Sequence, residues 1–355
     1  MVYFILFIII SIISLLELTN IKDKYTFILT IFIFLSLLIF AGLRYKTGTD
    51  YMNYYQIFKN INLNLYREKG FVLLNYIIKN IFSNFSILIL ILTLISLSTK
   101  FIYIIKFSYY WLITIFLYFS TYFLRWEMGA IRIGIAAGIL MHSSLHIKNR
   151  NFFKFIFLVF IAFMFHKASI LFIIVYFIGN KNYKNRLWLF IILLSIVIGY
   201  TNFIEKTTIY ILNNFNKDIF IFNKLESYFY RSHSNVSIIS TSFIKKITII
   251  TLSLFLRNIL KTKNKFYNIY MNIVFVGYSL YFLLINSIPE LGLRVPTLFV
   301  FYEILLIPNF ILAFKKTSSK FLIYLLIFFI SAGSFTMHLL KWKDLFIPYK
   351  NIFIF

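Results

Sequence analysis

The 355-residue chain contains no cysteine and little of what builds linkers. Without cysteine it can form neither a disulfide framework nor a thiolate site, so redox and zinc-thiolate functions are excluded. Four prolines and eleven glycines leave no Pro/Gly/Ser-rich linker, and no internal repeat or inverted half marks a transporter fold. We therefore expect a single transmembrane domain over residues 1–355.

Charged residues are also scarce, at 13% of the chain, whereas hydrophobic residues make up 61% and aromatic residues 21%. The mean hydropathy is +0.86, and no soluble core could absorb that much apolar surface. The composition therefore predicts an integral membrane protein. Residues 1–18 are apolar and lack a basic n-region and a small-residue cleavage site, so we expect a retained first helix rather than a signal peptide.

Apolar runs long enough to cross a bilayer recur along the chain, and helices are the spanning form that such continuous runs favour. The pattern predicts an all-α, polytopic integral membrane protein with about 10–12 transmembrane helices, short cytoplasmic loops and longer extracytoplasmic loops. The runs cover approximately residues 2–18, 25–43, 84–105, 109–124, 128–147, 187–204, 241–260, 266–288, 294–314 and 320–340.

Basic residues outnumber acidic ones by 36 to 11, giving a net charge of +25, and they form short clusters in the connections between apolar runs. This distribution is typical of topology signals and of contact with anionic headgroups, so nucleic acid is not an expected partner. The positive-inside rule places the clusters in the cytoplasm, and the N-terminus and two polar stretches, about 44–83 and 205–240, outside. The clusters are Lys22/Lys24, Lys100/Lys106, Lys148/Arg150/Lys154, Lys181/Lys184/Arg186, Arg257/Lys261/Lys263/Lys265 and Lys315/Lys316/Lys320.

The segment 152–178 has two interpretations because His166 and Lys167 interrupt it. If the clusters at Lys148 and Lys181 are both cytoplasmic, the chain crosses an even number of times between them, and the segment is two short pieces with His166 near an outer turn. The alternative is one long tilted helix with His166 in the middle of the membrane.

Short polar motifs stand out against this apolar background along most of the chain. They are Arg44 followed by Gly48-Thr49-Asp50-Tyr51 and Tyr54-Tyr55, Glu68-Lys69-Gly70-Phe71, Arg125, Ile131-Arg132 before a small-residue helix, Phe165-His166-Lys167-Ala168-Ser169, Arg294 and Pro348-Tyr349. Together they resemble the EpsG/Wzy-type polysaccharide polymerases.

This resemblance implies a membrane glycosyltransferase that joins undecaprenyl-pyrophosphate-linked oligosaccharide repeats into an O-antigen, capsule or exopolysaccharide. The site would face the periplasm or exterior from the bacterial cytoplasmic (inner) membrane. Lipid-linked oligosaccharides would be donor and acceptor, membrane lipids would surround the chain, and a chain-length regulator is a further candidate partner. A sugar hydroxyl would displace undecaprenyl pyrophosphate, which requires cations for the leaving group and a base. An O-antigen ligase and a lipid-linked oligosaccharide flippase or other transporter are the alternatives.

Four arginines at the outer ends of expected spans are candidates for binding pyrophosphate, namely Arg44, Arg125, Arg132 and Arg294. Arginine suits this role because its planar fork pairs with phosphate oxygens and stays charged at low dielectric. If one helix includes both Arg125 and Arg132, they share a face with Gly129 between them. The alternative is that these side chains extend to lipid headgroups.

His166 and Asp50 are the candidates for the catalytic base. The alternative role of His166 is a hydrogen-bonded core histidine, and that of Asp50 is the cap of a helix beginning near Tyr51. Glu68 is a candidate for substrate binding or a first-turn carboxylate. Tyr54 is a candidate for stacking on a sugar ring, with an interfacial aromatic belt as the alternative.

Other polar or small residues predict packing or pairing. His142 and His146 lie four apart without an acidic companion, so no metal is expected there. Small residues at every fourth position from Ala130 to Gly138 predict close approach of a neighbouring helix. Glu303 is expected to pair with a basic residue. No Walker-type loop or dinucleotide fingerprint is present, and neither a cofactor nor a metal is expected.

Overall fold

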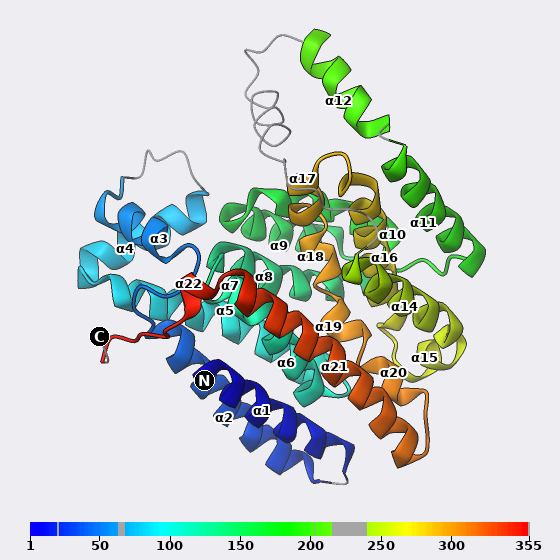
Figure 1. The fold of residues 1–355 in the computed structure, drawn as a ribbon, viewed down its shortest axis with the longest axis horizontal. Coiled ribbons are helices and arrows are strands. Elements are labelled where there is room, and N and C mark those ends of the chain that lie inside the picture. Colours follow the sequence, from blue (N-terminus) through cyan, green and yellow to red (C-terminus); the bar gives the residue numbers. More distant parts are fainter. Residues whose placement is uncertain (20, 63–67, 202, 215–239, 354–355) are drawn as a thin grey trace. The chain divides into compact units, whose positions relative to one another are not determined.

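The computed structural model describes residues 1–355 except 20, 63–67, 202, 215–239 and 354–355. The described residues form helices and connections, with one isolated β-bridge and no β-strand among them (Figure 1). Five helices are each long and apolar enough to cross a membrane, and the bent pair Asn185–Tyr200 and Phe203–Ile211 would make a sixth. The expected all-α, polytopic membrane class is therefore confirmed, and the number of crossings stays a prediction.

The chain forms two compact units, and the expectation of a single domain stays a prediction. Unit 1 comprises Met1–Tyr176 and Ile304–Phe355, and unit 2 comprises Phe177–Glu303. Unit 1 contains α1 (Val2–Leu15), η1 (Leu16–Leu18), α2 (Asp23–Gly42), α3 (Tyr51–Lys59), α4 (Lys69–Phe82), α5 (Phe85–Phe107), α6 (Trp111–Tyr118), η2 (Phe119–Phe123), α7 (Leu124–Trp126), α8 (Ile131–Lys148), α9 (Phe152–Phe165), η3 (Lys167–Ile173), α20 (Asn309–Leu312), α21 (Thr317–Lys341) and α22 (Lys343–Phe346). Unit 2 contains α11 (Asn185–Tyr200), α12 (Phe203–Asn214), α14 (Thr241–Phe255), α15 (Arg257–Lys263), α16 (Tyr267–Leu284), α17 (Pro289–Arg294) and α18 (Thr297–Val300), while α10 (Ile174–Ile178) and α19 (Glu303–Leu306) lie at the boundaries.

Helix α8 packs against both α5 and α9 in unit 1. Its small residues face α5 closely, since a Cβ added to Gly138 would lie 2.2 Å from the hydroxyl oxygen of Thr99. A Cβ on Gly134 would lie 2.9 Å from the hydroxyl oxygen of Ser96. The predicted close helix approach at this small-residue series is therefore confirmed.

The stretch 44–83, expected as an outer loop, is largely helical because it contains α3 and α4. Apolar residues of both helices enter a core with the start of α5 and of α8, including Tyr54, Phe71, Phe85 and Ile131. This packing holds the polar motifs of residues 44–83 against the beginnings of α5 and α8. The second expected loop, 205–240, begins within α12, and its residues 215–239 lie outside the described part of the chain.

The segment 152–178 consists of two pieces. Helix α9 ends at Phe165, and His166 has an extended backbone with φ −149° and ψ 114°. The chain then folds back, so that the rings of Phe155 and Phe172 stack with centroids 6.5 Å apart. The two-piece interpretation, with His166 at the turn, is confirmed, and one long tilted helix is excluded.

The C-terminal segment returns to the end of α2 and holds the chain that follows it. The backbone N–H of Tyr45 donates to the carbonyl of Lys350 over 2.9 Å. The ring of Tyr349 stacks on Phe40 at 4.3 Å, and its hydroxyl donates to the Phe40 carbonyl over 2.8 Å. These contacts anchor the start of the first polar motif.

Unit 2 encloses a charged pair near the start of α14. Lys245 Nζ lies 2.6 Å from one carboxylate oxygen of Glu303, and the hydroxyl of Tyr278 donates to the other over 2.8 Å. Because Glu303 is only 3% exposed, its charge requires such partners. The expected pairing of Glu303 with a basic residue is confirmed.

Candidate functional site

Two turns that carry polar motifs are in direct contact in unit 1. Gly48 has φ +107°, and a Cβ at this position would lie 1.7 Å from the carbonyl oxygen of Met128. In return, a Cβ on Gly129 would lie 2.7 Å from the hydroxyl oxygen of Thr49. Only glycine accommodates both the positive φ and the close approach at position 48. The segment after α2 is therefore held against the turn between α7 and α8.

Arg125 and Arg132 lie on opposite sides of that turn. Helix α7 ends at Trp126 and α8 begins at Ile131, while the N–H of Ala130 donates to the carbonyl of Arg125 over 2.9 Å. The two arginines would share a face only if one helix contained both, and the structure does not meet that condition because they belong to different helices. The close contact at the intervening glycine replaces helical continuity with a turn.

Arg132 is at the centre of the candidate site. Its Nη1 lies 2.5 Å from a carboxylate oxygen of Glu68, with the two side chains 20% and 14% exposed. Its guanidinium carbon lies 5.7 Å from the ring centroid of Tyr54 and 5.5 Å from that of Phe71. Its Nε has no hydrogen-bond partner in the described part of the chain. Arg132 is thus held in place and retains exposed surface, while its unpartnered Nε is buried.

Asp50 and Glu68 occupy N-cap positions, but neither side chain caps its helix. The hydroxyl of Tyr54 donates to Asp50 Oδ2 over 3.3 Å, and Glu68 pairs with Arg132. Both carboxylates are therefore directed toward Arg132 and Tyr54 instead of toward helix N–H groups. The capping interpretation of Asp50 is not supported by the geometry.

Tyr54 is fully buried, so neither sugar stacking nor an interfacial belt fits its position. Burial raises the pKa of its phenol to about 12, and the phenol therefore stays protonated and donates to Asp50. The correction follows from α3 being packed on Phe71 of α4, whereas the sequence suggested an exposed loop. The ring of Tyr54 therefore lies against the guanidinium of Arg132, and its hydroxyl holds the carboxylate of Asp50.

Arg44 is only 1% exposed. Its Nη1 donates to the Ala41 carbonyl over 2.5 Å, while Nε and Nη2 have no hydrogen-bond partner among the described residues. Burial lowers the pKa of this guanidinium to about 10, so it remains charged at neutral pH. Direct contact with a substrate, as expected from the sequence, is closed off in this conformation. Its contribution is a positive potential beneath the two turns.

His166 lies at the edge of the same region. Two residues earlier, the carbonyl oxygen of Met164 would lie 3.1 Å from a Cβ on Gly70, so the end of α9 packs on the start of α4. Phe165 packs against the aromatic core that contains Tyr54 and Phe71. His166 therefore follows Met164 and Phe165, which pack on the beginning of α4, the helix that Glu68 precedes.

The remaining two arginines are placed differently. Arg125 is exposed and lies near enough to His338 of α21 to interact electrostatically. Arg294 belongs to unit 2, where its guanidinium lies 2.7 Å from Glu290 within α17 and its side chain is 58% exposed. The structure therefore brings Arg44, Asp50, Tyr54, Glu68 and Arg132 together in unit 1, with Arg125 and His166 at the sides.

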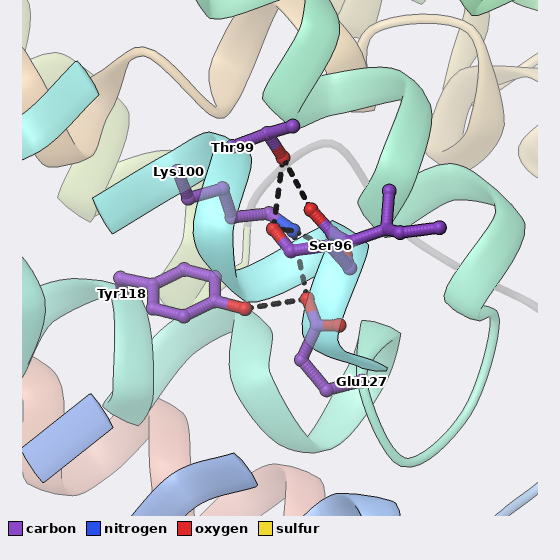
Figure 2. Close-up of polar contacts among 6 residues, drawn as sticks. Ser96, Thr99, Lys100, Tyr118 and Glu127 are labelled. Carbon is purple, nitrogen blue, oxygen red and sulfur yellow. Dashed lines mark hydrogen bonds and ion pairs between the residues drawn. The ribbon is translucent and has the colours of Figure 1, made fainter. Parts of the chain in front are cut away.

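A buried ion pair that sequence reasoning missed lies beneath the turn. Lys100 Nζ and Glu127 Oε1 are 2.8 Å apart, and both side chains are 0% exposed (Figure 2). Lys100 also donates to the hydroxyl of Ser96 over 2.6 Å, and the Tyr118 hydroxyl donates to Glu127 over 2.5 Å. A Cβ on Gly134 would lie 3.0 Å from Glu127 Oε1. The pair thus links α5, α6 and the turn before α8.

The assignment of Lys100 to a basic connection is wrong, because it lies inside α5 and not between helices. The signal that could have found it is its position within an apolar run, since ionisable residues inside spans are costly and need partners. The nearest acidic residue in the following apolar stretch is Glu127.

The cluster suits an anion. Two ion pairs, Lys100–Glu127 and Arg132–Glu68, have no net charge. The remaining charges are the positive ones of Arg44 and Arg125 and the negative one of Asp50, so positive charge is in excess. Helix α8 begins here with a cap, Ala130, that makes no side-chain hydrogen bond, and a helix N-terminus carries partial positive charge. Phosphate groups favour such surroundings.

The described residues contain no group of three or more His, Asp or Glu side chains that could hold a metal ion. His142 Nε2 lies 2.8 Å from the carbonyl oxygen of Thr99, which joins α8 to α5. In the described structure His142 therefore makes a hydrogen bond between α8 and α5.

Fold and site together define a multi-pass α-helical membrane protein with an arginine and carboxylate cluster in unit 1. The EpsG family matches residues 27–351, so the chain belongs to the EpsG family. Membership suggests a polysaccharide polymerase-type, glycosyltransferase-like function. No curated protein and no solved structure matches the chain.

Proposed function

We propose that this protein joins undecaprenyl-pyrophosphate-linked oligosaccharide repeats into a surface polysaccharide at the outer face of the bacterial cytoplasmic membrane. A hydroxyl of one lipid-linked repeat attacks the anomeric carbon of another, the bond to undecaprenyl pyrophosphate breaks, and the hydroxyl proton passes to a base. A single displacement inverts the anomeric centre. The observation that carries the proposal is the partly exposed Arg132, fixed between Tyr54 and Glu68.

Arg132 is the proposed ligand of the leaving pyrophosphate. Negative charge grows on the bridging oxygen as the glycosidic bond breaks, and a guanidinium held in advance stabilises that charge without reorganisation. The pairing with Glu68 orients the guanidinium before substrate binds. Exposed Arg125, across the turn, is the proposed second contact.

Arg44 and the N-terminus of α8 add a fixed positive potential from below. Arg44 is buried and charged, so its field passes through surroundings of low dielectric. The helix N-terminus contributes partial charge of the same sign. Together they would favour a pyrophosphate at Arg132 over a neutral sugar.

Asp50 and His166 remain the two candidates for the base. Asp50 accepts a hydrogen bond from Tyr54, whose ring lies under Arg132, so its carboxylate is joined to Arg132 through a single side chain. His166 sits at a break in the helical chain, where its backbone is extended. Arg294 of unit 2, exposed beside Glu290, stays a proposed ligand for pyrophosphate.

The test is genetic. Deleting the gene is expected to leave single repeats on the cell surface, and wild type but not Arg132→Gln is expected to restore long chains. Arg150→Gln, at the opposite end of α8, removes the same charge from an exposed turn and is the matched control. Long chains that persist in the deletion strain would refute the polymerase. Normal polymer that is not attached to its final acceptor would indicate a ligase instead.

A further inference from the structure

A cavity of about 500 Å³ in unit 2 involves none of the residues of the proposed transfer site. It lies between the connection that leads into α11 and the short helix α15. Its lining carries four cationic side chains and no carboxylate. The lining residues are Asn182, Tyr183, Lys184, Asn185, Arg186, Arg257, Asn258 and Lys261.

Arg257 builds the wall of this cavity. It is 4% exposed and donates to the Tyr183 carbonyl, to Asn185 Oδ1 over 2.7 Å and to Asn182 Oδ1 over 2.8 Å. Because a guanidinium has only donors, both asparagines must present their oxygens to it. The amide nitrogen of Asn185 in turn donates to the carbonyl of Leu254 over 3.3 Å. Arg257 therefore holds α15 against residues 182–185 before any ligand binds.

The other three cations supply the binding charge. Lys184, Arg186 and Lys261 are exposed side chains on the cavity wall. Lysine and arginine both pair with phosphate oxygens, and the start of α11, the connection before it and α15 bring these charges to one site. A zwitterionic headgroup would also bring an ammonium group, which finds no carboxylate partner in the lining. The charge pattern thus favours a ligand with net negative charge.

Exposed apolar side chains lie close in sequence to the residues that line the cationic cavity. Phe255, two residues before Arg257, is 82% exposed, and Ile259 of α15 is 45% exposed. Phe190 of α11, four residues after the lining residue Arg186, is 62% exposed. Free phosphate would gain nothing from these groups, whereas acyl chains would cover them. A basic site next to apolar helix surface is the arrangement that lipid headgroups recognise.

We propose that this cavity binds the headgroup phosphate of an anionic phospholipid, whose acyl chains lie along α11 and α14. The positive-inside rule assigns the basic clusters at Lys184 and at Lys261 to the cytoplasmic face, where anionic lipids provide such headgroups. The bound lipid joins the connection before α11 to α15 and stabilises unit 2. This site is independent of glycosyl transfer.

The test uses the full-length protein in detergent and native mass spectrometry to count bound lipid. Dioleoylphosphatidylglycerol, dioleoylphosphatidylcholine and inorganic phosphate are added separately at equal phosphate concentration. The triple variant K184Q/R186Q/K261Q is compared with K315Q/K316Q/K320Q, which removes the same charge from another basic connection. Lys184→Gln alone guards against misfolding of the triple variant.

The wild type and the control variant are expected to bind phosphatidylglycerol in preference to phosphatidylcholine. The cavity variant should bind it roughly 100-fold more weakly, because each basic residue near a membrane surface contributes a factor of about five. Lys184→Gln should show about a fivefold loss. Equal losses in both triple variants, or binding of inorganic phosphate without lipid preference, would overturn the proposal.

Discussion

Replacing Lys100 with methionine should destabilise unit 1 far more than its position in a hydrophobic helix suggests. Methionine keeps the length of the side chain but leaves Glu127 charged, 0% exposed and without its cationic partner. Removing one member of a buried ion pair typically costs about 3–5 kcal/mol, because the remaining charge stays desolvated. Glu127→Gln should cost a comparable amount, since it leaves a buried ammonium group.

The double variant K100M/E127Q provides the decisive comparison. It removes both charges, and the new amide at position 127 still offers an oxygen to the Tyr118 hydroxyl, so we expect it to be more stable than either single variant. Equilibrium unfolding in mixed micelles, followed by the fluorescence of the four tryptophans, measures the free energies. Lys106→Met, in the last turn of the same helix and exposed, is the control. If the double variant loses as much unfolding free energy as the two single variants lose together, the two side chains do not stabilise unit 1 as a pair.

Three further predictions concern the glycines and the site. Gly48→Ala should destabilise by about 1–3 kcal/mol from backbone strain alone, and an unchanged thermal midpoint would contradict the contact with Met128. Gly138→Ala should lower the thermal midpoint, whereas Gly333→Ala, with nothing within 4 Å, should not; equal effects would exclude tight packing as the cause. Arg132→Lys should keep the fold but lengthen glycan chains poorly, because lysine lacks the planar fork; full polymer length in this variant would exclude bidentate binding.

How far the sequence predicts the structure depends on whether the deciding contact is local. Helical class, the turn at His166 and the pairing of Glu303 follow from hydropathy, basic clusters and the cost of a buried charge. Lys100 is also a costly charge inside an apolar run. However, Lys106 lies six residues later, and two lysines so close together are typical of the basic clusters that mark cytoplasmic connections. Only the partner, 27 residues on, distinguishes the two roles.

The candidate site was predicted as a set of residues and not as an arrangement. Nothing near Asp50 in the sequence distinguishes a helix cap from a carboxylate directed at Tyr54, because the N-cap position is the same in both. Arg44 follows an apolar run and so resembles an interfacial arginine. Its burial depends on the C-terminal segment, about 300 residues later, and pairing at that separation leaves no local pattern.

Glycosyl transfer by the purified protein is the most direct test of the central proposal. Wild type is reconstituted into liposomes with undecaprenyl-pyrophosphate-linked repeats, and product length is read on gels after release from lipid. The proposal predicts ladders longer than one repeat with wild type and with Arg150→Gln, and single repeats with Arg132→Gln. Wild-type protein that leaves every repeat single under these conditions, or an Arg132→Gln variant that makes full ladders, would contradict it.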